Sequence, residues 1–443
     1  MKKKIYFIQT TFRRRNGILY QGKLAPFQSL ALAALSSTIP SSWEKEFCLE
    51  YFEEINYESD ASVIGLSCMA YDLVHAIEVA EEFRKRGKII IFGGYQPYFS
   101  KERIKHVCDS VVFGNPGPVE MKELLNDALD GKLKPEYVFG VDINFPFDYS
   151  IYKDINLQFP PVLSSIGCKN NCNYCCTAAI YKKYHMRDQQ YVLDDIESIR
   201  HSSKYACFVD SNIYNERDYL IELCSKIEKG KFKLSWGAQS TIDIANDDEV
   251  LNFLKMAGCK LLMVGLESLS QQNMKNVRKN YNIKKYRDQI QKLRSYGIYV
   301  FGLFLLGLDD DQPSDFNRLY KFIQQTGIVV AGLNILLPSP DTPIFQKLKS
   351  ENRLLINEED FIHKTYLDKE IINKCYYYPK NMSIRELEDN FMKLSGKLAS
   401  FRGMFGRSLS VNIYDSLRIF GLNMGFRKQF LDLKRDNNPS QNY

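Results

Sequence analysis

Apolar and polar residues alternate in blocks along the first third of the chain. Residues 24–36 and 75–86 have the mixed composition of helices with one apolar face. Between them lie runs rich in β-branched and aromatic residues, which are typical of buried strands. These runs occupy residues 4–10, 47–52, 62–68, 88–94 and 110–114. Strands that alternate with helices in this way predict an α/β domain over residues 1–135 with a doubly wound parallel sheet, whose ligand site lies at the carboxyl ends of its strands.

A second group of apolar strands follows an irregular, proline-punctuated stretch that we expect to be a linker over residues 136–160. The first of these strands ends just before Cys168. The others occupy residues 205–210, 233–238, 260–266, 299–306 and 329–335. With helical segments between them, they predict a partial barrel of six β/α units over residues 161–350. In such barrels the chemistry lies at the carboxyl ends of the strands.

Residues 351–443 change character and predict a C-terminal helical extension. One amphipathic helix is expected over residues 383–402, and Ser383 with Glu386 forms a capping box at its start. Further on, residues 411–421 and 425–433 mix Ile, Leu and Phe with Arg and Lys. That mixture suits either packing against the barrel or peripheral contact with a membrane surface. No stretch approaches the roughly 20 apolar residues of a transmembrane segment.

Composition narrows the classes of function. At 443 residues the chain exceeds the size of a single core, so two domains with an appendage are expected. The net charge of +6 arises from 59 basic and 53 acidic residues without a long basic block, which argues against nucleic acid as the main partner. Most of the 11 cysteines have no paired spacing, so we expect a reducing compartment and therefore the cytoplasm.

The candidate chemistry centres on Cys168, Cys172 and Cys175, which follow the strand at the start of the predicted barrel. Thiolates select zinc, copper or iron–sulfur clusters, and a structural zinc site would need a second pair of ligands that does not follow. Cys176 adjoins Cys175 and would have to point away from whatever Cys175 binds. Three ligands on a four-iron cluster leave one iron open for a substrate or cofactor. A zinc loop or three incidental cysteines remain as alternatives.

The pattern CxxxCxΦC, with Tyr174 before the last cysteine, resembles the signature of the radical S-adenosylmethionine (SAM) superfamily. The resemblance implies a [4Fe–4S] cluster held by Cys168, Cys172 and Cys175, with SAM chelated by the open iron. It also implies that one electron, from a donor such as flavodoxin or ferredoxin, cleaves SAM to give a 5′-deoxyadenosyl radical. Tyr174 matches the aromatic position of the family motif beside the cofactor.

Polar residues follow other strands of the predicted barrel. Glu267, in Gly-Leu-Glu-Ser, resembles the family's fourth-strand motif that hydrogen-bonds SAM; capping of a helix is the structural alternative. Asp210 and Asn212 resemble the second-strand motif that faces the cofactor. Gln239 matches a third-strand position that is polar or basic in some relatives. A side chain that forms its hydrogen bonds within the core would explain Gln239 equally well.

The N-terminal domain resembles the cobalamin-binding domain of one branch of the superfamily. The matches are the Leu-Ala-Pro helix start and the ends of the third to fifth strands. They imply cofactor contacts from Ser67, Gly93, Gly94, Tyr95, Gln96 and Gly114. The chain has Gly-Gly-Tyr-Gln and Gly-Asn-Pro-Gly where many relatives have Gly-Gly-x-His and Gly-Glu-Gly-Glu, and it lacks the Asp-x-His-x-x-Gly cobalt-ligand motif. We therefore expect cobalamin without a protein imidazole on cobalt; a scaffold without cobalamin is the alternative.

The resemblance implies a cobalamin-dependent radical SAM enzyme that methylates an unactivated carbon of a small-molecule, lipid or natural-product substrate. Residues 375–388 resemble the extension after the barrel in enzymes that act on hopanoids. A radical rearrangement, cyclisation or C–C coupling, with or without cobalamin, is the main alternative. A scaffold protein with an inert cluster is the non-enzymatic one. No residue beyond the cofactor contacts is identified as catalytic.

Overall fold

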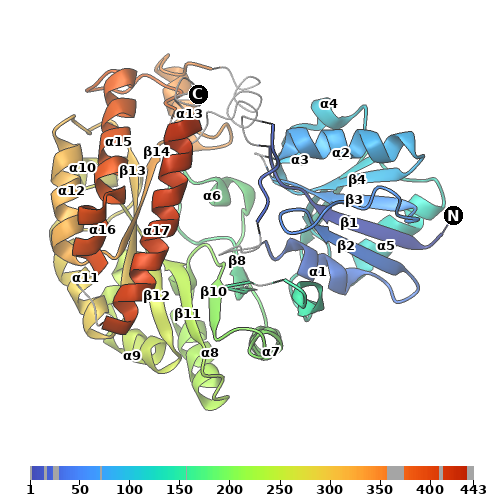
Figure 1. Ribbon diagram of the computed structural model, residues 1–443, viewed down its shortest axis with the longest axis horizontal. Helices are drawn as coiled ribbons and strands as arrows, with labels where there is room; N and C mark the ends of the chain where they lie inside the picture. The colour runs from blue at the N-terminus through green and yellow to red at the C-terminus, as the bar shows by residue number, and fades with distance from the viewer. Residues whose placement is uncertain are drawn as a thin grey trace. The chain divides into compact units, whose positions relative to one another are not determined.

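A computed structural model describes residues 2–13, 17–22, 29–69, 72–155, 157–356, 374–408 and 413–436. The chain forms two compact units (Figure 1). The first consists mainly of residues 1–163 and 187–207. The second consists mainly of residues 164–186 and 208–361 together with the C-terminal helices.

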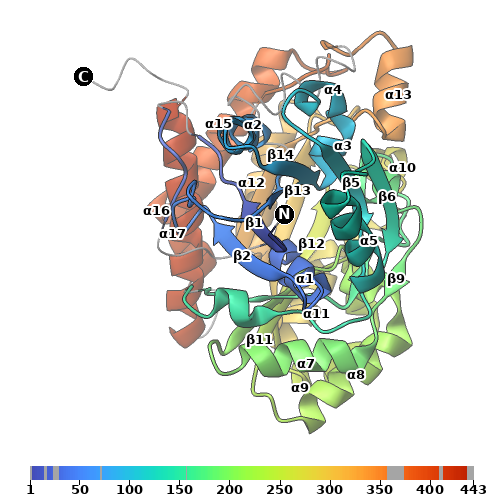
Figure 2. The same cartoon turned by 90° about the vertical axis from the view of Figure 1, so that its right-hand side faces the viewer.

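The N-terminal sheet has six strands in the order β2-β1-β3-β4-β5-β6, all paired in parallel (Figure 2). The strands are β1 (Lys4–Gln9), β2 (Glu44–Leu49), β3 (Val63–Ser67), β4 (Ile89–Gly93), β5 (Ser110–Asn115) and β6 (Glu136–Val141). The strand order reverses between β1 and β3, as in a doubly wound sheet, so that prediction is confirmed.

Helices connect these strands. They are α1 (Ala31–Thr38), α2 (Leu73–Lys85), α3 (Tyr95–Phe99), α4 (Lys101–Ile104) and α5 (Pro118–Leu129). The 3-10 helix η1 (Tyr149–Tyr152) follows β6, and α7 (Gln189–Ile199) belongs to the same compact unit but precedes β10 of the second sheet. The core on one face packs Ile64, Leu66 and Phe92 of the strands against Val79 and Phe83 of α2. The predicted helix start at residues 24–28 lies outside the described residues.

Strand β6 falls within the stretch that the sequence indicated as linker. Tyr137 is buried, whereas Glu136 and Val138 are exposed. Residues 137–141 are a short apolar run, but they follow Pro135 within a proline-punctuated stretch, and for that reason the sequence indicated a linker and not a strand.

The second sheet has six strands in the order β14-β13-β12-β11-β10-β7. They are β7 (Pro161–Val162), β10 (Tyr205–Phe208), β11 (Ser235–Ser240), β12 (Cys259–Glu267), β13 (Tyr299–Leu306) and β14 (Val330–Ile335). The strand order follows the chain order in an open sheet, as a partial barrel requires. The predicted succession of six strands with helices between them is therefore confirmed.

The connections of this sheet are α8 (Arg217–Lys229), α9 (Asp248–Met256), α10 (Gln271–Asn276), α11 (Tyr286–Ser295) and α12 (Asp315–Thr326), with the 3-10 helices η2 (Ile213–Asn215), η3 (Ile242–Asn246) and η4 (Ile283–Lys285). Between β7 and β10 the chain forms a small antiparallel pair, β8 (Ser165–Ile166) with β9 (His185–Met186), and helix α6 (Cys176–Ile180).

The C-terminal helices are α13 (Pro343–Ser350), α15 (Ile384–Ala399), α16 (Phe401–Ser408) and α17 (Ile413–Asp436). The capping box at the start of α15 is confirmed. The predicted helix over residues 383–402 is interrupted, because Ser400 adopts an extended backbone between α15 and α16. No helix in the described ranges carries an apolar stretch long enough to cross a membrane.

Candidate active site

The cluster loop, residues 167–175, connects β8 to α6 and carries the three predicted ligands. Cys168 and Cys175 are half-buried, Cys172 is buried, and all three are free thiols. Gly167 opens the loop with a φ of +88°, and a Cβ there would lie 2.7 Å from the Lys183 carbonyl oxygen. Glycine is therefore required at the turn into the loop.

The donor set fits an iron–sulfur cluster better than a single ion. Among the described residues, no three His, Cys, Asp or Glu side chains converge closely enough to ligate one metal ion. A four-iron cluster binds each thiolate through a different iron, so its cysteines need not converge on one point. Burial raises the pKa of Cys172 to about 11, and the nearby Lys279 ammonium opposes that rise, as it favours the thiolate that a cluster requires.

Asp210 anchors the chain that leads into the cluster loop. Its carboxylate is fully buried and accepts hydrogen bonds from the Ser164 N–H (3.1 Å), the Ser164 hydroxyl (2.6 Å) and the Ser165 hydroxyl (2.5 Å). Burial raises the pKa of Asp210, and these serine bonds oppose the rise. Both oxygens are thus engaged beneath the loop in the structure.

Asn212 and Asn215 hold the first cysteine's side of the cluster loop. The Asn215 side-chain oxygen accepts from the Lys169 N–H and from the Asn212 amide, each at 3.2 Å. That oxygen also lies 3.6 Å from Cys168 Sγ. The sequence predicted Asn212 but missed Asn215, because an asparagine on a short connection has no distinguishing pattern.

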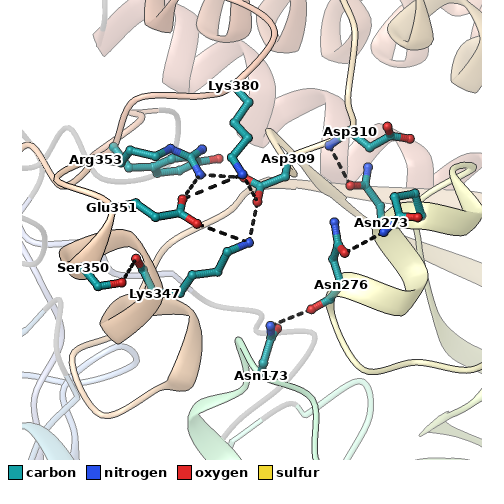
Figure 3. Close-up of polar contacts among 12 residues, drawn as sticks. Asn173, Asn273, Asn276, Asp309, Asp310, Lys347, Ser350, Glu351, Arg353 and Lys380 are labelled. Carbon is teal, nitrogen blue, oxygen red and sulfur yellow. Dashed lines mark hydrogen bonds and ion pairs between the residues drawn. The ribbon is translucent and has the colours of Figure 1, made fainter.

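Asn173 holds the other side of the cluster loop (Figure 3). Its side-chain amide donates to the Asn276 carbonyl at the end of α10 (2.7 Å). Its own carbonyl accepts from the Ile344 N–H at the start of α13 (3.0 Å). Residues that lie more than 100 positions further along the chain therefore fix the loop.

Glu267 ends β12 beside the cluster loop and forms a buried ion pair. Its carboxylate lies 2.6 Å from Lys279 Nζ, and each residue is only 8% exposed. Burial opposes the charge on Lys279, yet Glu267 and Cys172 hold its pKa above the ordinary value. Burial also raises the pKa of Tyr174, whose hydroxyl is hydrogen-bonded to Glu267. The structure thus brings Tyr174, Glu267 and Cys172 together, as the sequence predicted, and adds Lys279.

The backbone around Glu267 is shaped for this ion pair. Glu267 has a φ of +57°, the left-handed region that non-glycine residues rarely adopt. A Cβ on Gly265 would lie 2.3 Å from the Glu267 carboxylate and 2.8 Å from Lys279 Nζ. Gly265 therefore makes the room that the pair occupies. No sequence pattern marks Lys279, which stands among other polar residues twelve positions after its partner.

Gln239 stays apart from these contacts. It lies near the end of β11 with an exposed side chain, so hydrogen bonding within the core does not explain the glutamine at this position.

In the N-terminal sheet, the predicted cofactor residues lie at the carboxyl ends of β3, β4 and β5. Ser67 pairs in register with Gly93, and Gly93 pairs with Val112. A Cβ on Gly93 would meet nothing within 4 Å. Gly94 and Gly114 have φ values of +114° and +102°, so their backbone conformation already favours glycine.

Tyr95 and Gln96 open helix α3. The Tyr95 ring packs edge-on against Phe113 at 5.6 Å. The Gln96 amide donates to the Ser100 hydroxyl at 2.8 Å. Both residues are thus placed next to Gly94, and each already has a partner within the domain.

Residues 1–135 contain two histidines, and both lie close to carboxylates. The ring nitrogens of His75 lie 2.7 Å from the Glu50 carboxylate and 2.9 Å from the Glu78 carboxylate. His106 is exposed and lies 3.7 Å from Glu81. Both ring nitrogens of His75 are thus engaged by carboxylates, whereas His106 is exposed.

Comparison with known proteins identifies the domain that carries the cluster loop. The family model of the radical SAM superfamily matches residues 162–323. These residues are a radical SAM domain. Such a domain uses a [4Fe–4S] cluster, SAM and a reductant, so the chain carries the machinery of a radical SAM enzyme.

Two curated relatives and one solved structure are similar to most of the chain. The bacteriochlorophyllide d C-12(1)-methyltransferase of Chlorobaculum tepidum is 26% identical over 372 residues, 80% of this chain and 78% of that protein. The bacteriochlorophyllide d C-8(2)-methyltransferase of the same organism is 23% identical over 88% of this chain and 91% of that protein. The solved structure is that of the radical SAM methyltransferase TsrM from Kitasatospora setae, with cobalamin and a [4Fe–4S] cluster bound. It superposes on this chain with a TM-score of 0.68 at 13% sequence identity. The superposition covers 99% of this chain and 100% of TsrM. The radical SAM domain is therefore embedded in a fold that a cobalamin-binding methyltransferase shares.

Proposed function

We propose that this radical SAM enzyme depends on cobalamin and methylates an unactivated carbon of a small-molecule substrate. The observation that carries the proposal is the extent of the similarity. Relatives named methyltransferases match 80% and 88% of the chain, and the TsrM fold covers 99% of it. The likeness therefore includes the N-terminal sheet as well as the radical SAM domain.

In this proposal, Cys168, Cys172 and Cys175 hold the cluster. Glu267 accepts a hydrogen bond from the SAM ammonium group, and Lys279 balances the buried charge of that carboxylate or pairs with the SAM carboxylate. When bound, the cluster with SAM supplies a carbon-centred radical that abstracts hydrogen, and cobalamin supplies the methyl group. The protein's own contribution is to fix the cofactors and exclude water.

We assign the cobalamin to the carboxyl ends of the strands of the N-terminal sheet, next to Ser67, Gly93 and Gly114. The strand order supports this assignment. It reverses between β1 and β3, and ligands of doubly wound sheets bind at the carboxyl ends of the strands beside that reversal. Both ring nitrogens of His75 are engaged by glutamates. We therefore propose that no protein imidazole binds the cobalt.

We propose that flavodoxin or ferredoxin reduces the cluster in the cytoplasm. The cysteines outside the cluster loop have no paired spacing in the sequence, which fits a reducing compartment.

The test is anaerobic reconstitution with iron, sulfide, SAM and methylcobalamin. We expect about four iron atoms per chain, because each of the three thiolates binds one iron of a four-iron cluster. We also expect 5′-deoxyadenosine from SAM and a methylated product from a porphyrin or lipid candidate. Replacing Cys168, Cys172 and Cys175 together by Ala should abolish iron binding and deoxyadenosine formation.

The matched control is Cys176→Ala, which removes a neighbouring exposed thiol. It should keep the iron and the deoxyadenosine. Iron retained by the triple variant would contradict the cluster assignment. Deoxyadenosine formed without methyl transfer to any candidate would favour a radical rearrangement or cyclisation.

A further inference from the structure

Exposed apolar side chains gather on the two last helices of the chain. We name this set the tail ridge. It consists of Phe401 and Phe405 on α16 and Leu417, Met424 and Leu431 on α17. Leu417 is 75% exposed and the two phenylalanines are 59% and 57% exposed. Helices α16 and α17 lie side by side (Figure 1), and the Phe405 ring contacts the Phe420 ring at 6.5 Å.

The tail ridge is not the face that attaches α17 to the second sheet. Ile419 and Phe426 of α17 pack with residues of β13 and β14, and the Asn423 amide donates to the Val329 carbonyl at 2.9 Å. A helix turns about 100° per residue, so Met424 lies about 140° around the axis from Ile419. Leu417 and Leu431 are each seven positions from Met424 and share its side of the helix. Helix α17 is therefore apolar on two opposite sides, and only one of them is used by the core.

Positive charge surrounds the tail ridge. Helices α16 and α17 contain three Asp, no Glu and seven Arg or Lys residues, of which Arg407 is buried. Arg402, Lys428 and Lys434 are exposed beside the ridge. The Arg427 guanidinium lies 4.4 Å from the centre of the Phe401 ring and bonds the Ala399 carbonyl at 2.7 Å. The aromatic rim of the ridge is thus directly associated with a cation.

We propose that the tail ridge binds an anionic lipid membrane surface. The apolar side chains enter the boundary between headgroups and acyl chains, and the surrounding cations contact lipid phosphates. Charge complementarity selects this occupant. A second copy of the chain would bring the same positive excess against the ridge, whereas an anionic bilayer neutralises it. The binding is peripheral and independent of the catalysed reaction.

The test is co-sedimentation of the full-length protein with lipid vesicles. We expect strong partitioning onto phosphatidylcholine vesicles that contain about a third phosphatidylserine, with weak partitioning onto pure phosphatidylcholine and loss of binding at high salt. Replacing Leu417, Met424 and Leu431 together by Asn should lower the partition coefficient at least about tenfold, because it removes the apolar area that enters the bilayer. Replacing Arg402, Lys428 and Lys434 by Gln should remove the preference for anionic vesicles.

A matched control replaces three exposed apolar residues elsewhere by Asn, namely Val119, Val138 and Met256. It should bind vesicles as the unchanged protein does. Absence of binding to anionic vesicles, or equal binding by the ridge and control variants, would overturn the proposal. A dimer in solution that the ridge variant dissociates would also overturn it and assign the ridge to self-association. The charge variant keeps every apolar contact, so it provides a valid test even if the Asn variant fails to fold. Deoxyadenosine formation in solution serves as the separate check on the radical chemistry.

Discussion

At the scale of single residues, Glu267 is the most informative position of the radical SAM domain. A non-glycine residue in the left-handed region costs about 1–3 kcal/mol. A buried ion pair also gains little over apolar side chains of similar volume, because desolvation offsets its Coulomb attraction. Stability therefore explains neither the backbone of Glu267 nor its pairing with Lys279. A role in binding a charged ligand explains both.

Changing Glu267 to Gln should weaken SAM binding and leave the iron content intact, because in the proposed function this side chain binds the cofactor and not the metal. The loss of one charge-assisted hydrogen bond should raise the dissociation constant of SAM about ten- to a hundredfold. Equilibrium binding of SAM to the reconstituted enzyme measures it. Glu228→Gln, on the exposed side of α8, is the control and should bind SAM normally. An unchanged constant in the Glu267→Gln enzyme would leave Glu267 with a structural role alone.

The sequence predicts some residues of the site and not others for a physical reason. The three cysteines and Tyr174 lie within eight positions, so their spacing records the chemistry directly. Lys279, Asn215 and Asn173 act through partners that only the folded chain brings near. Their residue types carry no local pattern, and a single sequence does not distinguish them from surface residues.

At the scale of elements, the loop after β13 connects three parts of the second unit. Asp309 forms ion pairs with Lys347 (2.6 Å), Arg353 (2.8 Å) and Lys380 (3.3 Å) of the C-terminal extension (Figure 3). Lys347 and Arg353 hold the pKa of Asp309 at about 2 against the effect of burial. The next two carboxylates accept hydrogen bonds from other residues: Asp310 from the Ser270 hydroxyl and Asp311 from the Asn273 amide. Three adjacent aspartates thus join the extension, α10 and β13.

Asp311 makes the stability of this unit depend on pH. Burial raises its pKa to about 7, even though the Gly307 and Leu308 N–H groups donate to it. The folded protein therefore keeps a proton that the unfolded chain loses near pH 4. The resulting contribution to stability is present at low pH and is lost as pH rises through about 7. Its size is on the order of 4 kcal/mol at most.

Urea unfolding between pH 4 and pH 8 measures this effect. The free energy of unfolding should fall with rising pH more steeply in the unchanged protein than in Asp311→Asn, which has no carboxyl group to titrate there. Asp288→Asn, at an exposed position of α11, should follow the unchanged protein. Parallel pH profiles of the unchanged protein and Asp311→Asn would contradict the prediction.

Helices and strands, like site residues, were predictable from the sequence where a local pattern of residues determines them. The buried strands were recognisable because parallel strands covered on both faces are continuous apolar runs. Edge strand β6 was missed because its short apolar run follows Pro135 in a proline-punctuated stretch that indicated a linker. The break at Ser400 was missed because the apolar periodicity continues across it, while the backbone there turns to pack α16 beside α17.

At the scale of the whole molecule, cobalamin binding is the property that the N-terminal unit would add to the radical SAM domain. Protein produced with cobalamin should carry about one equivalent, and paramagnetic resonance of its Co(II) form should show no nitrogen splitting from a protein imidazole. The reason is that Glu50 and Glu78 occupy both ring nitrogens of His75, while His106 is exposed. His75→Gln should give the same spectrum. Nitrogen splitting that disappears in that variant would contradict the proposed unligated cobalt.

The two sheets and their order were predictable because each repeats one local unit, a strand followed by a helix. The arrangement of charged groups around those sheets was not. Asp309 and Arg353 form an ion pair because the chain after α13 comes back to the end of β13. The residues around Asp309 and around Arg353 contain no pattern that predicts this contact.

The hydrogen bond between the Ile344 N–H and the Asn173 carbonyl also bears on the order of biosynthesis. The ribosome completes the three cysteines about 170 residues before it reaches Ile344. At the usual rate of translation this delay is on the order of ten to thirty seconds. During that time the thiols are present but one side of their loop is not yet fixed. We therefore expect the cluster loop to reach the arrangement described above only after α13 has been translated.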